Sequence, residues 1–349
     1  MRIVSLLPSA TEIVCALGLA DSLVGITHEC DYPAEVVAHL PVVTSSAIPA
    51  THPAEEGEEE GLPLNGAEID EYVRRALDAG ESLYRIDTEK LRELQPDLLL
   101  TQGLCDVCAV THKAVVKAVD ALGGTGVQVL DLAPTTLAGV LETFRQVGQA
   151  TGQQAEAESL VLQTQARWDA VRTKAAQTSE RPRTLLLEWP EPLFSAGHWN
   201  PELLQLAHGI GAPWDKPGEP SRTLSWDEVR AFAPELIVLL ACGWDAYRAL
   251  EEAYILAELP GWFDLPAVQN GDCFAVDGNA YFNRPGPRLA ESAEILATVL
   301  HPETFTEMLP PYSVQIFPME YMEPPQPEPE QSLSKYQQKQ AAKKAAQTP

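Results

Sequence analysis

The amino-acid sequence predicts an α/β protein of two doubly wound lobes joined by a rigid long helix. Short apolar strands alternate with helical segments in both halves, which is typical of parallel sheets covered by helices. A unit of helix, proline and strand occurs once in each half, and a long helical segment lies between the halves. At 349 residues the chain also exceeds the length that one hydrophobic core usually supports.

The N-terminal lobe is expected over residues 1–150. Its first strand, at 2–7, leads to Ser9 and Glu12, which have the spacing of a capping box and predict a helix that ends at Gly18. The other elements predicted in this lobe are strands at 23–26, 41–44, 97–101 and 126–130 and a helix at 108–122.

An acidic insertion is expected at 47–82, within the N-terminal lobe. Its first part, residues 47–67, holds three prolines and five glutamates. Like charges repel one another and such a composition cannot build a core, so this part is predicted to be a mobile loop.

The connecting helix is expected within 151–180, because residues 153–178 contain no helix breaker. At 1.5 Å per residue such a helix would be about 39 Å long. The C-terminal lobe follows at 181–308, with strands at 184–187 and 273–276 among its elements. The tail at 309–349 is rich in Pro, Glu, Gln and Lys and is predicted to be disordered.

The two halves contain an internal echo. Residues 87–100 and 225–238 both show a capped helix, then a proline, then an apolar strand, although a chance match is the alternative because such units are common. Ligands of open α/β sheets bind beyond the carboxyl ends of the strands. The loops with Cys105 and Cys242 follow these two strands and are therefore expected at the ligand site.

The composition argues against several functions. The net charge of −26, from 50 acidic and 24 basic residues, disfavours nucleic acid and anionic membranes as partners. No apolar run approaches the roughly 18 residues of a membrane span, so no membrane insertion is expected. The sequence has no nucleotide phosphate loop and no G-x-S-x-G nucleophile motif, and we expect no enzyme.

The cysteine content and the start of the chain bear on localisation. Six cysteines are too few for a disulfide scaffold at this length. The residues ahead of the first strand do not resemble an export signal. We therefore expect a cytoplasmic protein with free thiols, or a periplasmic or cell-surface protein if the start site is misassigned.

Loops at strand ends in both halves hold aromatic and polar side chains that could contact a ligand. Each loop has a structural alternative: a polar turn after the second strand, aromatic rings that fill the second lobe, and a structural ion pair for Arg284. The candidate ligand contacts are His28, Glu29, Tyr32, Tyr84, Trp189, His198, Trp199, Tyr281, Asn283 and Arg284.

A second set of candidates is built from thiols. Cys105 and Cys108 form a C-x-x-C pair that opens a predicted helix, where amide dipoles lower a thiol pKa. The pair could be a redox couple, or half of a zinc or iron site that Cys30 and Cys242 complete across the fold. A metal-binding or thiol-redox protein on the same scaffold is therefore the alternative function.

The order of these motifs resembles that of the class III substrate-binding proteins of ABC importers, and especially their cobalamin-binding branch. The resemblance covers roughly residues 2–300. It rests on the strand–helix opening at 3–12, the loop end at 31–33, the aromatic loop at 194–197, and the adjacent aromatic residues 281–282 ahead of Arg288.

This resemblance implies two lobes joined by a rigid helix, with the ligand between them and little closure. It implies a corrinoid such as cobalamin as the ligand, held for uptake or salvage, and an importer permease as the partner. Flat ligands suit a cleft with aromatic walls and a few polar contacts. In that case Cys105, Cys108 and Cys242 would also be wall residues.

Overall fold

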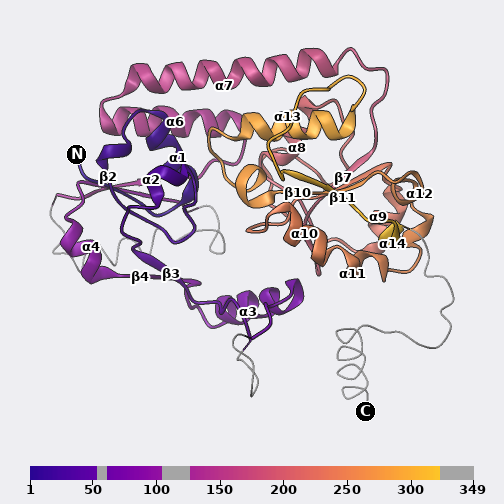
Figure 1. Ribbon diagram of the computed structural model, residues 1–349, viewed down its shortest axis with the longest axis horizontal. Helices are drawn as coiled ribbons and strands as arrows, with labels where there is room; N and C mark the ends of the chain where they lie inside the picture. Colours follow the sequence, from indigo (N-terminus) through magenta and orange to yellow (C-terminus); the bar gives the residue numbers. More distant parts are fainter. Residues whose placement is uncertain (53–60, 104–125, 323–349) are drawn as a thin grey trace.

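The computed structural model describes residues 1–52, 61–103 and 126–322, and it has two α/β lobes beneath one long helix (Figure 1). Each lobe is built on its own sheet, and both sheets have a parallel centre flanked by helices. The predicted fold class is thereby confirmed. None of the helices in the described ranges has both the length and the apolar content needed to cross a bilayer.

The first lobe contains a four-stranded parallel sheet in the order β2-β1-β5-β6. The central strand β1 is completely buried, and its Val4 lies opposite Leu99 of β5. The elements of this lobe are β1 (Ile3–Ser5), α1 (Pro8–Ala16), β2 (Leu23–Ile26), α2 (Ala34–Val37), α4 (Thr88–Leu94), β5 (Leu98–Thr101), β6 (Gln128–Asp131) and α6 (Leu137–Thr151).

The first helix does not have the predicted capping box. Leu7 is the N-cap residue of α1, Pro8 occupies the first turn, and no side chain caps the helix. The carboxylate of Glu12 binds Arg288 instead. The predicted end of the helix is confirmed, because Gly18 follows the last turn with a positive φ of 74° that disfavours other residues.

The second lobe contains a five-stranded sheet in the order β11-β10-β9-β7-β8. Its three central strands are parallel, whereas the two edge strands run antiparallel to them. The elements are β7 (Thr184–Pro190), β8 (Leu193–Ser195), α8 (Asn200–Leu206), α9 (Trp226–Phe232), β9 (Leu236–Leu239), α10 (Ala246–Glu252), α11 (Tyr254–Ala257), α12 (Pro266–Asn270), β10 (Cys273–Val276), a π-helical turn (Gly278–Phe282), α13 (Leu289–Leu300), β11 (Val314–Ile316) and α14 (Met319–Met322).

The insertion carries secondary structure of its own. Strand β3 (Thr44–Ser46) pairs with β4 (Tyr84–Ile86), and α3 (Gly66–Asp78) lies between them in the chain. The predicted strand at 41–44 is therefore displaced to 44–46, because Val42 makes only an isolated bridge to Ile26. The glutamate run lies outside the described residues, as do the predicted helix at 108–122 and residues 323–349 of the tail. The start of the tail is not disordered as predicted, because residues 314–316 form β11, which pairs with β10.

The internal echo is confirmed in detail. Helices α4 and α9 are capped by the side chains of Asp87 and Ser225. Both helices end at a residue in the left-handed conformation, Gln95 (φ 44°) and Ala233 (φ 49°). The strand that follows each helix, β5 or β9, then enters the middle of its sheet.

The connecting helix is α7 (Gln154–Ala175), which runs above α6 of the first lobe and α13 of the second (Figure 1). Trp168 of α7 is 5% exposed, and its indole N–H donates to the carbonyl of Leu289 at 3.0 Å. Arg167 binds Glu291 and Glu294 of α13. The lobe boundaries at 150 and 180 remain predictions, but α7 clearly contacts both lobes.

We expect Trp168→Ala to lower the free energy of unfolding by ~3–5 kcal/mol, because it leaves a cavity between α7 and α13. Urea denaturation measures this change. The control Leu162→Ala lies on the same helix and removes a side chain that is 61% exposed, so a change within about 0.5 kcal/mol is expected. Equal effects of the two substitutions would contradict a role for α7 in joining the lobes.

Candidate functional site

A network of ion pairs, largely buried except at Asp31, joins the two lobes. Arg288, at the start of α13, donates to the carboxylate of Glu12 in α1 at 3.0 Å. Arg284 donates to both carboxylate oxygens of Asp31, and to the carbonyl of Glu29 at 3.1 Å. Glu12 is 3% exposed and Arg284 6% exposed, so water screens these charges little.

The network bears on the two interpretations of Arg284. Four acceptors surround its guanidinium, because Asn279 Oδ1 also accepts at 2.9 Å. The structural ion pair is therefore the arrangement in the free protein, and a ligand contact of Arg284 stays a prediction. Burial raises the pKa of Glu12, although the neighbouring Arg288 opposes the shift.

Two tyrosines flank the network. The ring of Tyr32 lies 4.3 Å from the guanidinium carbon of Arg288, and the ring of Tyr281 lies 5.5 Å from it. Such cation–π contacts fix the orientation of an aromatic face. Tyr32 is exposed, whereas Tyr281 is partly buried, so Tyr32 offers the more accessible surface at this junction.

His28 is held by several contacts within the first lobe. Its Nδ1 lies 2.7 Å from Thr44 Oγ1, and Tyr84 packs against the imidazole with a centroid distance of 5.7 Å. Nε2 lies 3.2 Å from a carboxylate oxygen of Glu29 without a well-directed hydrogen bond. The imidazole holds the pKa of the Glu29 carboxyl below its ordinary value, partly against the effect of burial.

The second lobe contributes a pair of indoles. Trp189 and Trp244 lie with their ring centroids 4.3 Å apart. The indole N–H of Trp189 donates to the carbonyl of Gly66, in the insertion of the first lobe, at 3.2 Å. The insertion and this aromatic pair are therefore in direct contact.

Three predicted contacts lie within the packing of the second lobe. Trp199 is 4% exposed, and its N–H donates to the carbonyl of Phe282 at 2.8 Å. His198 packs on that indole, and burial lowers the pKa of its imidazole. The Asn283 amide donates to the carbonyls of Leu240 and Gly278. These side chains support the loops rather than the interlobe junction in the free protein.

The structure describes only two of the four candidate thiols, Cys30 and Cys242. Cys105 and Cys108 lie outside the described residues. The thiol of Cys30 forms a hydrogen bond with the hydroxyl of Thr11, with 3.0 Å between Sγ and Oγ1. Burial raises the pKa of this thiol to about 12. Within the described part of the chain, no group of three or more His, Cys, Asp or Glu side chains is placed to hold a metal ion.

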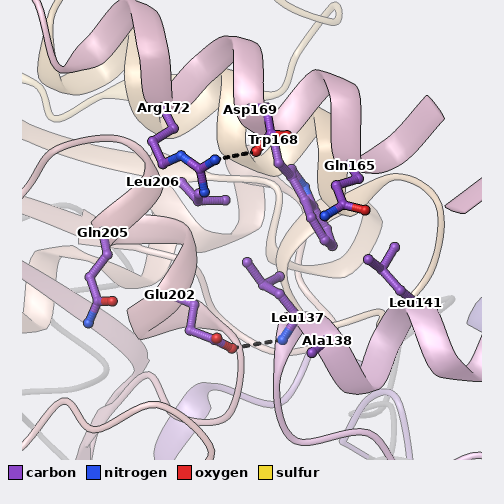
Figure 2. A pocket seen from close by; sticks show the side chains of 10 residues that line it. All are labelled: Leu137, Ala138, Leu141, Gln165, Trp168, Asp169, Arg172, Glu202, Gln205 and Leu206. Carbon is purple, nitrogen blue, oxygen red and sulfur yellow. Dashed lines mark hydrogen bonds and ion pairs between the residues drawn. The ribbon is translucent and has the colours of Figure 1, made fainter. Parts of the chain in front are cut away.

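A cavity of about 350 Å³ lies away from this junction, between α6, α7 and α8 (Figure 2). Glu202 of the second lobe reaches its edge and accepts the backbone N–H of Leu137 at 2.7 Å. This contact places a carboxylate at the N-terminus of α6, where the helix dipole favours negative charge. It is a further link between the lobes.

Sequence reasoning did not assign Glu12, Asp31, Trp244 or Arg288 to the site. Glu12 was interpreted as a helix cap, and its partner Arg288 follows 276 residues later. Trp244 gave no signal because a single tryptophan after a strand is an ordinary core residue. Only the folded chain brings these groups together.

Comparison with known proteins identifies the scaffold. A family model described as "Periplasmic binding protein" matches residues 3–280. The chain belongs to this family. The predicted resemblance to substrate-binding proteins is thereby confirmed.

Two relatives support this assignment by sequence. The chain is 26% identical to the uncharacterized ABC transporter substrate-binding lipoprotein YvrC of Bacillus subtilis, over 88% of this chain and 82% of the relative. It is 23% identical to the vitamin B12-binding protein of Vibrio cholerae, over 86% of this chain and 88% of the relative.

Solved structures of the periplasmic binding protein family share the fold. The apo haem-binding protein RhuT from Roseiflexus sp. RS-1 has a TM-score of 0.62 at 23% identity, covering 87% of this chain and 99% of its own. The vitamin B12-binding protein BtuF of Vibrio cholerae has a TM-score of 0.59 at 21% identity, covering 86% and 96%.

The expected cytoplasmic localisation is wrong. The matched relatives are named as a lipoprotein and as periplasmic binding proteins, which points to a place outside the cytoplasm. The start of the chain had suggested otherwise, but the family carries more weight than the first few residues.

We expect Arg288→Met to lower the free energy of unfolding by ~3–5 kcal/mol, because it leaves the buried Glu12 carboxylate without its main partner. Adding Glu12→Leu should recover part of that loss, since the double variant buries no unpaired charge. Thermal and urea unfolding of the four proteins gives the coupling energy. Arg145→Met, which removes an exposed ion pair between α6 and Glu158 of α7, is the control and should change stability little. Additive single effects would rule out a coupled pair.

We expect Cys30 to resist alkylation at pH 8, because with a pKa of about 12 roughly one thiol in ten thousand is a thiolate. Iodoacetamide labelling followed by peptide mass spectrometry should show Cys30 reacting ~1,000-fold more slowly in the folded protein than in urea. Equal rates in the two conditions would show that the thiol is neither buried nor held by Thr11.

Proposed function

We propose that this chain is the substrate-binding component of an importer and that it holds a corrinoid between its lobes. The observation that carries the proposal is that aromatic side chains take part in, or lie beside, contacts between the lobes. Tyr32 lies on Arg288 of the second lobe and Tyr84 on His28, while the Trp189–Trp244 pair contacts the insertion of the first lobe at Gly66. The similarity to a vitamin B12-binding protein, in sequence and in fold, supports it.

Large planar ligands match such a junction for a physical reason. Aromatic faces bury a wide area of the ligand, while a few polar groups at the rim set its orientation. His28 and Glu29 are suited to the rim, because both are partly exposed and sit at the end of β2. Outside the cytoplasm, this protein would deliver the bound ligand to its permease.

Haem is the second candidate, and His28 is the observation that favours it. An imidazole nitrogen is a common axial ligand of haem iron. Thr44 Oγ1 can accept a hydrogen bond from Nδ1–H, which would leave the lone pair of Nε2 to the iron, and such a second partner is usual for a metal-binding histidine. Several solved structures that share the fold are of haem-binding proteins.

Calorimetry on ligand-stripped protein tests the proposal. We expect cyanocobalamin or cobinamide to bind with 1:1 stoichiometry, and His28→Ala and Tyr84→Ala each to weaken binding by ~1–3 kcal/mol if the side chains are buried anchors. Tyr312→Ala, an exposed tyrosine before β11, is the control and should not change affinity.

Absorption spectra separate the two ligands. Haemin binding with a Soret shift that His28→Ala abolishes, together with no heat from any corrinoid, would replace the first candidate by the second. No binding of either ligand class would refute a tetrapyrrole as the cargo.

A further inference from the structure

The insertion crosses from the first lobe to the second. We call residues 64–78, which include α3, the strap; Figure 1 shows α3 between the lobes on the side opposite α7. Three hydrogen bonds hold its start to the second lobe. Arg248 donates to the carbonyl of Leu64 (2.7 Å), the N–H of Gly66 donates to Glu252 (3.1 Å), and Trp189 donates to the carbonyl of Gly66 (3.2 Å).

The anchor for this contact is built into the second lobe. Glu252 is 8% exposed and pairs with Arg248 at 2.6 Å, and the guanidinium of Arg248 lies over the ring of Trp244. A carboxylate that accepts the first N–H of a helix is favoured by the helix dipole as well as by the hydrogen bond. Ile69, one turn further along α3, packs against the core of the second lobe.

Gly66 allows the close approach. A Cβ at this position would lie 3.0 Å from Trp244 and 3.5 Å from the indole nitrogen of Trp189. The strap therefore rests its backbone directly on the aromatic pair that we assign to the ligand. In the free protein the polar edge of Trp189 is occupied by the chain itself.

The remainder of the strap is loosely held. Gly66 is the only buried residue of α3, while Tyr72 and Leu77 are exposed. The helix has its own capping box between Asn65 and Glu68, so it can stay helical when it leaves the second lobe. Few contacts beyond the start of the strap therefore oppose its local opening, and the contacts of Leu64–Ile69 set most of the free-energy cost.

We propose that the strap is a gate over the ligand site: Leu64–Ile69 covers the Trp189–Trp244 wall and must move aside before a ligand reaches it. The inference rests on the proposed function, since it assigns that wall to the ligand. The lobes are tied on the other side by α7 and internally by the ion pairs of Arg284 and Arg288. Entry therefore depends on local motion of the strap, with the lobes fixed.

Hydrogen exchange of the ligand-free protein tests the motion. Glu252→Ala removes the acceptor of Gly66, and Gly66→Leu places a side chain against Trp244. Each should speed hydrogen exchange in peptides from residues 61–80 by roughly tenfold or more. In Glu252→Ala the buried N–H of Gly66 loses its charged acceptor, and in Gly66→Leu the new side chain displaces the strap. Peptides from α7 and α13 should be unchanged. Glu71→Ala, which removes an exposed ion pair on α3, is the matched control.

Stopped-flow fluorescence tests the gate. If the strap covers the site, cyanocobalamin or haemin should associate at least roughly tenfold faster with both variants than with the wild type or Glu71→Ala. A strap that exchanges faster while association stays the same would overturn the gate and leave the proposed function standing.

A neutral quencher separates the gate from the ligand. Acrylamide should quench the indole fluorescence of Gly66→Leu more strongly than that of the wild type, and Trp189→Phe should reduce this difference. If no tetrapyrrole binds any variant, the proposed function fails, and the quencher result alone then decides whether the strap covers the wall. Unchanged quenching would overturn the gate.

Discussion

The arrangement of the two lobes depends on charges buried between them. Glu12 and Asp31 of the first lobe face Arg284 and Arg288 of the second, and three of these four side chains are largely shielded from water. A buried charge that loses its partner costs several kcal/mol, so separation of the lobes is strongly opposed. Because α7 also spans both lobes, the network and α7 together hold the lobes in one relative position, which we call a fixed frame. Side chains of the two lobes that face the junction therefore keep their distances from one another.

A fixed frame changes how a ligand can enter. In a protein whose lobes open by a hinge, the aromatic side chains of each lobe move apart together with that lobe. Here the ion pairs and α7 oppose such a separation of the lobes. The movable part is the strap, which contacts the second lobe through its start, from Leu64 to Ile69. The insertion thus combines one attachment through β3 and β4 with a second, local attachment to the other lobe at Leu64 and Gly66. Such an asymmetry suits a segment that opens at one end.

Sequence reasoning predicted the parts of this fold that follow from local chemistry. The echo at 87–100 and 225–238 was readable because a cap, a proline and an apolar strand leave a pattern within fourteen residues. The ion network was not readable, because Glu12 and Arg288 are distant in sequence and Ser9-x-x-Glu12 fits a capping box equally well. Trp199 and Asn283 stay predicted ligand contacts, but their hydrogen bonds within the second lobe were not readable, since composition does not show which way a loop side chain packs.

The choice between a corrinoid and haem depends on the surroundings of His28. Its Nε2 lies 3.2 Å from a carboxylate oxygen of Glu29, and this contact lowers the pKa of the Glu29 carboxyl. An axial bond from Nε2 to haem iron would require Glu29 to turn away, at the expense of that contact. A corrinoid needs no such change, because His28 and Glu29 can meet polar groups at its rim as they stand. The geometry of the free protein therefore favours the corrinoid, which is why we place it first.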